Sequence, residues 1–197
     1  MEQDDSIKHN HKLNTDWIIW YHAPNDKNWG INSYKSILEI KTLEDFLVLY
    51  NSWDICLPKV TEAMFFIMRK FSSGEIIYPR WEDKNNINGG YWSFKIGNDS
   101  SKEIWDNLTK LLIGEVICCS EHLNINGISI SPKKNFCIIK IWNKDSALDS
   151  SLMFTEDLKS ILNIDEIKYS SHNKNIKRDL DKINKNKRRP RRGLTKF

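Results

Sequence analysis

The sequence contains no apolar run long enough to cross a membrane, which argues against an integral membrane protein. Its first residues, MEQDDSIKHNHK, are too polar and acidic for a signal peptide, so we expect no secretion. The four cysteines (56, 118, 119 and 137) lack the spacing of a disulfide framework. Two of them are adjacent, as is typical of reduced thiols inside the cell, and we expect a cytoplasmic protein.

Motifs of the common enzyme classes are also missing. The sequence has no HExxH motif, no phosphate-binding loop ending in GK[ST] and no GxSxG elbow. Cys118, Cys119 and His122 are close together but have no second ligand cluster, so we expect neither a metal site nor a cofactor. These absences predict a binding protein and not an enzyme.

Charge is distributed unevenly along the chain. The 197 residues include 30 Lys and Arg and 26 Asp and Glu. Residues 174–197 hold 11 of the basic and 2 of the acidic residues, which leaves 19 basic and 24 acidic residues elsewhere. An acidic body with a basic tail favours a small specific pocket and a separate tail over a generally basic RNA-binding surface.

Hydrophobic periodicity predicts one α+β domain built on an antiparallel sheet, because strands and helices do not alternate regularly. Helices are expected from Thr42, which with Asp45 approximates a capping box, from Ser101 to about Ile113, and from Ser151 to Leu162. Strands are expected at 17–21, 34–40, 64–70, 91–96, 127–131, 136–142 and 166–170. We expect a disordered leader (1–10), a folded domain (11–173) and a flexible basic tail (174–197).

Eight tryptophans are more than a core of this size requires, and two of them lie in polar loops. Trp29 follows NDKN, and Trp81 is followed directly by Glu82. Two loop indoles can stack a base between them, and a cationic base adds a cation–π attraction. Glu82 can accept from N1–H and the amine of guanine, whereas Asp83 is interpreted as structural or solvated. The pattern alone leaves open that Trp29 is a core anchor. Trp17, Trp20, Trp92 and Trp105 are assigned to the core.

The segments HKLNTDWIIWYH, TLEDFLVLYN, WEDKNNINGGYW and LLIGE occur in this order. They resemble the eukaryotic translation initiation factor 4E family of messenger-RNA cap-binding proteins, over about residues 11–172. The resemblance implies a curved sheet backed by three helices on its convex face, with the cap, or 7-methyl-GTP, as ligand. It also implies that Trp29 and Trp81 sandwich the cap base and that Glu82 reads it. Trp142 would line the pocket near the N7 methyl group, although a core role is equally compatible.

The resemblance further implies cations at the mouth of the pocket. Counted back from Trp142, Lys133 falls at the family's arginine position, but Ile138 replaces the family's lysine. Phosphate contacts would therefore weaken, or move to Lys134 or Lys140. Arg178 falls where the family has a basic residue in its last loop. The alternative for each is an exposed cation without a fixed partner.

The partner-binding back face departs most from the family, which docks a helical peptide of scaffold or repressor proteins there. Leu47 replaces a tryptophan, and the second helix places Asp106 and Lys110 in the groove, whereas Leu43 still fits. Added charge no longer suits an amphipathic helix without compensation. Either the partner is charge-complementary, the face works differently, or the usual partner is absent.

The function expected from these features is recruitment of capped messenger RNA for translation. One alternative is a repressive homologue that cannot engage the scaffold. Another is a general RNA-binding module driven by the basic tail, with all aromatic residues structural. The tail itself is interpreted either as an RNA contact or as a nuclear-import or partner signal.

Overall fold

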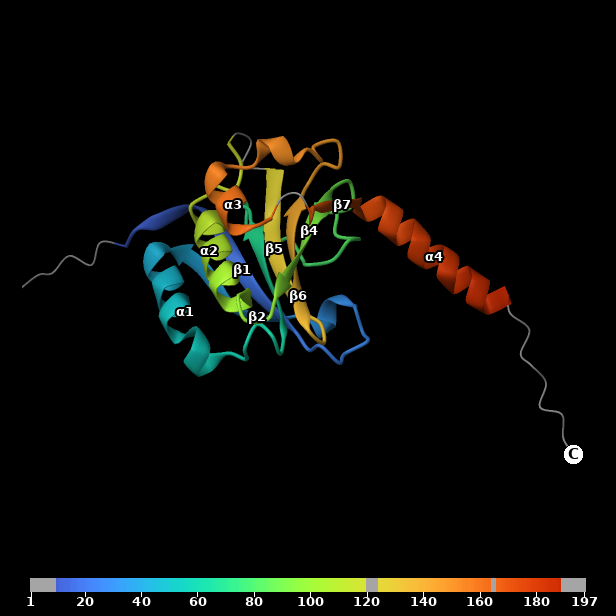
Figure 1. The fold of residues 1–197 in the computed structure, drawn as a ribbon, viewed down its shortest axis with the longest axis horizontal. Coiled ribbons are helices and arrows are strands. Elements are labelled where there is room, and N and C mark those ends of the chain that lie inside the picture. The colour runs from blue at the N-terminus through green and yellow to red at the C-terminus, as the bar shows by residue number, and fades with distance from the viewer. Residues whose placement is uncertain (1–9, 120–123, 164–165, 189–197) are drawn as a thin grey trace, which may run out of the picture.

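The computed structural model describes residues 10–119, 124–163 and 166–188, and it forms one curved sheet with helices packed on it (Figure 1). All neighbouring strands pair antiparallel, in the order β2-β1-β3-β5-β6-β4-β7. The strands are β1 (Lys12–His22), β2 (Lys35–Thr42), β3 (Met64–Lys70), β4 (Gly90–Gly97), β5 (Ile125–Pro132), β6 (Phe136–Asn143) and β7 (Lys168–Ser171). The predicted α+β class with an antiparallel sheet is confirmed.

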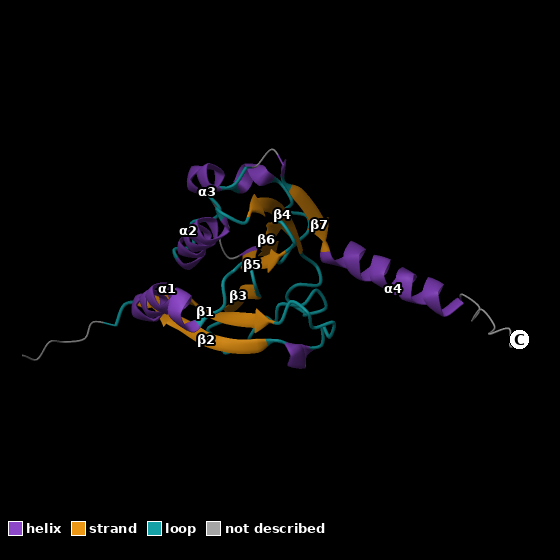
Figure 2. Cartoon of the chain, turned by 60° about the horizontal axis from the view of Figure 1, so that its bottom comes forward, coloured by secondary structure: helices purple, strands orange, loops and turns teal. Residues whose placement is uncertain are grey.

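Three helices cover one face of the sheet: α1 (Leu43–Cys56), α2 (Ser101–Ile113) and α3 (Glu156–Ile161) (Figure 2). Between this layer and the sheet, Trp17, Trp92 and Trp105 are almost completely buried, so the core role predicted for them is confirmed. Trp20 is also buried, but in a smaller cluster with Trp142. The short 3₁₀ helices are η1 (Ile31–Ser33) and η3 (Ser151–Met153).

The helix starts follow local chemistry. The predicted capping box of α1 is present: Thr42 Oγ1 accepts from the Asp45 amide at 3.1 Å, and Asp45 Oδ2 accepts from the Thr42 amide at 3.0 Å. The second helix begins at Ser101, as predicted, but Ser101 is not its cap: the N-cap is Ser100, whose side chain makes no capping hydrogen bond. Ser101 is instead buried, and its hydroxyl donates to the Asn98 carbonyl at 2.7 Å.

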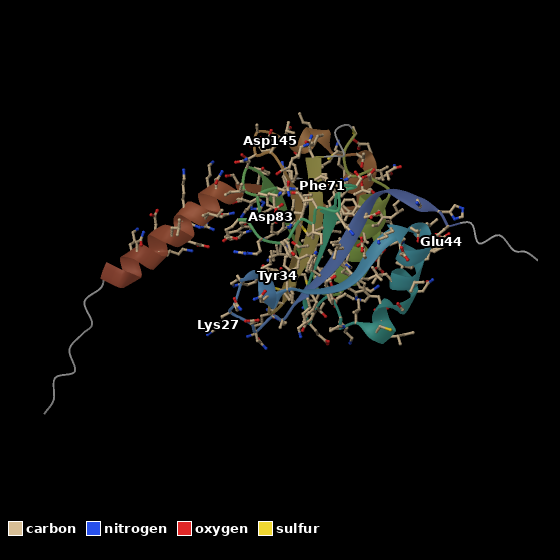
Figure 3. All side chains as sticks on the ribbon, turned by 180° about the vertical axis from the view of Figure 1, so that it is seen from behind. Lys27, Tyr34, Glu44, Phe71, Asp83 and Asp145 are labelled. Carbon is tan, nitrogen blue, oxygen red and sulfur yellow. The ribbon has the colours of Figure 1, made fainter. Side chains whose placement is uncertain are left out.

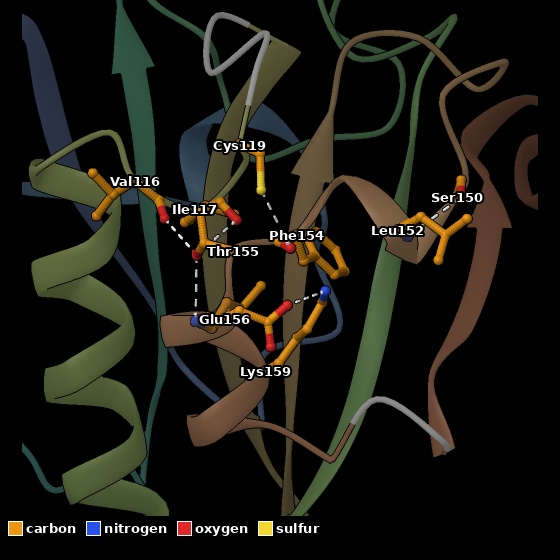
Figure 4. A network of polar contacts seen from close by, with 10 residues as sticks. Val116, Ile117, Cys119, Ser150, Leu152, Phe154, Thr155, Glu156 and Lys159 are labelled. Carbon is orange, nitrogen blue, oxygen red and sulfur yellow. Dashed lines mark hydrogen bonds and ion pairs between the residues drawn. The ribbon is translucent and has the colours of Figure 1, made fainter.

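The predicted single helix from Ser151 to Leu162 is broken at Thr155. The Thr155 hydroxyl donates to the Val116 carbonyl at 2.8 Å and caps α3 by accepting from the Leu158 amide at 3.4 Å (Figure 4). This tie to the end of α2 holds Thr155 in an extended conformation, so η3 and α3 are separate.

The tail also differs from prediction. We expected flexibility from Lys174, but α4 (His172–Arg188) is a helix that extends away from the body (Figure 1). Its first turns are anchored by His172 and Asn175, which are buried against the domain. Residues 189–197, and residues 1–9 of the predicted leader, lie outside the described part of the chain. Among the described residues, no helix has the length and apolar character needed to cross a membrane.

Candidate functional site

The loop that carries Trp81 is fixed by its own polar side chains. Asp83 accepts from the Tyr78 amide at 3.1 Å and from the Asn85 amide at 2.9 Å. Asn86 is completely buried and donates to the carbonyls of Tyr78 and Arg80 at 2.9 and 2.8 Å. Because these bonds close the loop from both sides of Trp81, the indole is presented on a rigid support.

This loop is also tied to the sheet. Asn126, at the start of β5, donates from one amide group to Asn86 Oδ1 at 2.9 Å and to the Asn85 carbonyl at 2.7 Å. At the far end of the loop, a Cβ atom on Gly89 would lie 1.9 Å from the Asn143 carbonyl oxygen. Only glycine allows the chain to pass β6 this closely.

Trp29 is supported differently, by the end of β1. Its indole stacks on the His22 ring with a centroid separation of 4.3 Å and an interplanar angle of 3°. His22 Nε2 lies 2.9 Å from the Asn28 carbonyl, so this nitrogen carries the proton in the neutral ring. Trp29 remains 51% exposed, in contrast to the buried core tryptophans, and it is not a core anchor.

One cavity of about 630 Å³ brings the predicted base-binding residues together. Trp29, Trp81, Glu82 and Trp142 all line it, although they come from two loops and a strand. The cavity also contains residues that sequence reasoning missed, namely Tyr34, Met64, Phe66, Pro79, Arg80, Tyr91, Ser93, Ser129, Ser131 and Asp179. Tyr34 and Asp83 lie toward the α4 side of the molecule, far from Glu44 on α1 (Figure 3).

Trp142 is both a core residue and a lining residue. Its ring is 2% exposed, and Nε1 donates to Ser129 Oγ at 3.0 Å. The imidazole of His172 packs on it with a centroid separation of 4.9 Å. Burial, reinforced by Lys140, lowers the pKa of His172 to about 3, so this imidazole is neutral at physiological pH. Trp142 is therefore a core residue that also lines the cavity, and its position near an N7 methyl group stays a prediction.

Glu82 is an exposed carboxylate at the rim, and Arg80 orients it. Arg80 Nη2 lies 3.5 Å from Glu82 Oε2. The ring of Tyr34 lies beside Trp29, with a centroid separation of 6.5 Å, and burial raises the pKa of its phenol well above the ordinary value. Tyr34 therefore stays protonated and offers a hydroxyl donor to the cavity.

The structure separates the predicted phosphate-binding cations into two groups. Lys133 and Lys140 line the cavity, as does Ile138 between them. Lys134 and Arg178 are not among its lining residues. Arg178 instead donates to Asn175 Oδ1 at 3.1 Å.

Lys140 is the most unusual of these cations. Its Nζ atom lies 4.1 Å from the ring centroid of Tyr91, and burial followed by the charge of Lys133 lowers its pKa to about 8. Alternation along β6 places residues 138, 140 and 142 on one face, so the sequence already contained the signal that Lys140 shares the face of Trp142.

The predicted partner surface lies on the opposite side, on α1 and α2. Leu43 and Leu47 are 41% and 45% exposed. The charge of Asp106 is neutralised within α2, because Lys102 Nζ lies 2.7 Å from its carboxylate. Lys110 lies over the Tyr50 ring at 4.8 Å and so brings its charge to the junction between the two helices. Both charges predicted on this surface therefore have partners on the helices themselves.

A curved antiparallel sheet with helices on one face and an aromatic cavity beside a carboxylate defines a base-binding protein. The described residues contain no cluster of side chains able to hold a metal ion. The family model described as eukaryotic initiation factor 4E matches residues 12–187, so the chain belongs to this family.

Individual relatives agree with this assignment. Initiation factor 4E of Candida albicans is 27% identical over 82% of this chain and 79% of its own length. The fold is similar to Ascaris suum initiation factor 4E-3, solved with an m2,2,7G cap (TM-score 0.68, 26% identity, 83% of this chain and 92% of that chain). It is also similar to C. elegans initiation factor 4E-3, solved with the 4E-binding protein Mextli and a cap analogue (TM-score 0.71, 22% identity, 85% and 96%).

Proposed function

We propose that this protein binds the 7-methylguanosine cap of messenger RNA and recruits capped messenger RNA for translation initiation. The observation that carries this proposal is the convergence of Trp29, Trp81 and Glu82 on one cavity of about 630 Å³. Membership of the initiation factor 4E family and the similarity to a member solved with a methylated cap support it. Its role is binding without catalysis, in the cytoplasm.

The base is recognised by stacking and by one carboxylate. Each indole face contributes about 1–3 kcal/mol to stacking. Methylation at N7 makes the guanine cationic, which adds a cation–π attraction of about 1–2 kcal/mol in a desolvated slot. Glu82, held toward the rim by Arg80, accepts from N1–H and the exocyclic amine, a pair of donors that adenine does not offer.

The phosphates are held by Lys133 and Lys140, the two lysines that line the cavity. Lys140 compensates for the isoleucine at position 138, since it lies two residues further along the same strand face. Its side chain forms no ion pair within the described part of the chain, so a phosphate would supply the missing anion. Lysine acts as a point charge and restricts phosphate geometry less than arginine would.

A peptide helix of a scaffold or repressor protein docks on the opposite side, near Leu43 and Leu47 on α1. The two residues remain exposed, which is consistent with a docking surface. Loss of the tryptophan at position 47 and the charge of Lys110 weaken the usual helix. An activator and a repressive cap binder share the same cap site and differ only in this contact.

Ligand selectivity tests the proposal. Tryptophan fluorescence is measured during titration with 7-methyl-GTP and with GTP. We expect quenching and at least tenfold tighter binding of the methylated nucleotide, because only that base is cationic. Equal affinity for the two nucleotides would contradict cap binding and favour a general RNA-binding module.

A further inference from the structure

The helix α4 presents two chemically different sides. One side packs against residues that line the cavity: His172 packs on Trp142, and Asn175 Nδ2 donates to the Tyr91 hydroxyl at 3.3 Å. Asp179, one further turn along, lines the cavity. These positions share one side of the helix, because it has 3.6 residues per turn. The first two turns of the helix therefore support the wall of the ligand site, and Asp179 reaches the cavity itself.

The other side is basic and exposed. Its cations are Lys174, Lys177, Arg178 and Lys185, whereas Lys182, seven residues after Asn175, lies on the side of Asn175 and Asp179. In the part of the chain that the structure describes, only Lys182 of these five has a carboxylate partner, Asp179 at 3.0 Å. The basic side therefore offers four cations that are not neutralised by an acid.

This charge lies on the helix that contributes Asp179 to the cavity. Residues 172–188 hold 7 of the 30 basic residues and 2 of the 26 acidic ones, whereas residues 1–171 hold 19 basic and 24 acidic residues and are net acidic. The helix of 17 residues is about 25 Å long and extends away from the body of the domain (Figure 1). A cap is followed by a chain of phosphates, and beyond Lys133 and Lys140 in the cavity the basic side of α4 offers further exposed cations on a helix that reaches the same cavity.

We propose that the basic side of α4 binds the phosphate backbone of the RNA that follows the cap. The contact is independent of base sequence, because lysine and arginine neutralise phosphates without reading base edges. This inference extends the proposed function and rests on it, because cap binding is what would place the 5′ end of the RNA beside α4. It also makes capped RNA, and not the isolated cap nucleotide, the preferred ligand.

The test uses the full chain and two variants of equal net charge. The first variant replaces Lys174, Lys177 and Lys185 by glutamine, which removes charge while keeping helix propensity. None of these three lysines is among the lining residues of the cavity. The matched control replaces three exposed lysines elsewhere on the body, Lys12, Lys59 and Lys144, by glutamine. Affinities are measured for 7-methyl-GTP, for a capped unstructured RNA of at least ten nucleotides and for the same RNA uncapped, at low and moderate salt.

We expect the α4 variant to bind capped RNA roughly tenfold more weakly at low salt, with the log–log salt slope reduced by about 2, since each neutralised phosphate contributes about 0.7. Its affinity for 7-methyl-GTP, and all affinities of the control variant, should remain unchanged. Unchanged binding of capped RNA by the α4 variant would overturn the proposal and favour an acidic protein as the occupant.

The uncapped RNA separates this proposal from the proposed function. If the wild-type chain fails to bind 7-methyl-GTP, the proposal of cap binding is wrong, but uncapped RNA still tests whether α4 contacts phosphates. Weaker binding of uncapped RNA by the α4 variant than by the control then supports the phosphate contact. Equal binding by the two variants overturns it.

Discussion

The ammonium group of Lys140 lies 4.1 Å from the ring centroid of Tyr91 and 5.8 Å from that of Trp81. A cation of the protein therefore occupies the aromatic surroundings that a cationic base would also contact. Burial, reinforced by Lys133, lowers the pKa of Lys140 to about 8. From this position the ammonium group can either contact a phosphate of the ligand or compete with the cationic base for the aromatic rings. The two possibilities predict opposite effects of replacing Lys140 on ligand affinity.

We expect Lys140→Met to weaken 7-methyl-GTP binding about tenfold, because a charge-assisted phosphate contact is lost. Wild-type affinity should also fall more steeply between pH 7 and 9. Lys140 loses its proton near pH 8 in the free protein, and a bound phosphate requires the charged form. In the Lys140→Met variant, the pH dependence of affinity comes only from the ligand and from the other titratable groups of the protein. Calorimetry across this pH range measures both effects, and tighter binding by the variant would establish competition instead.

The sandwich predicts that Trp29→Ala and Trp81→Ala each lose about 1–3 kcal/mol of cap affinity through one missing stacking face, plus part of the cation–π attraction. Trp29→Ala should leave the melting temperature nearly unchanged, because this ring is 51% exposed. Fluorescence titration with 7-methyl-GTP and thermal unfolding give the two readouts. Near-wild-type affinity in either variant would remove that indole from the site.

Glu82→Ala should weaken 7-methyl-GTP binding by about 2–4 kcal/mol, since two guanine donors lose a charged acceptor. The melting temperature should not change, because the carboxylate is exposed and contacts only Arg80 among the described residues. Glu62→Ala, which removes an exposed acid outside the cavity, is the matched control. Equal losses in the two variants would show that the reading acid is misassigned.

Asp83→Ala serves as a second comparison, and here the structure changes the expectation. The sequence predicts a small effect, but Asp83 holds the amides of Tyr78 and Asn85. We therefore expect a lower melting temperature together with a moderate loss of affinity, as the Trp81 loop loosens. Thermal unfolding with and without 7-methyl-GTP distinguishes this indirect effect from direct base recognition.

On the opposite face, a docking peptide of the usual tyrosine-and-leucine type should bind weakly. Leu47→Trp should raise the affinity for this peptide at least fivefold, because it restores an indole to α1. Leu152→Trp places the same ring on a distant residue that is 85% exposed, and should have no effect. Calorimetry with the peptide measures both. Tight binding by the wild-type chain would contradict the assignment of position 47 to the groove.

The strands and the first two helices were predictable because their apolar residues alternate or recur at helical spacing. The α4 helix was not, since its sequence has few apolar residues and it is anchored by His172 and Asn175, whose burial depends on tertiary contacts with Tyr91 and Trp142. The site shows the same division. Motif spacing identified Trp81 and Glu82, whereas the roles of Arg80 and Asn86 depend on distances that only the folded chain defines.

The two indoles of the cavity are held from different strands. Trp29 rests on His22 at the end of β1, and the Trp81 loop is tied to Asn126 at the start of β5. Only β3 lies between these strands, and its register places His22 opposite Met64 but Asn126 next to Gly127, the partner of Met68, so the two supports lie at opposite ends of β3. The two indoles are therefore anchored independently, and a substitution that loosens one support would alter the ligand site while the other indole stays in place.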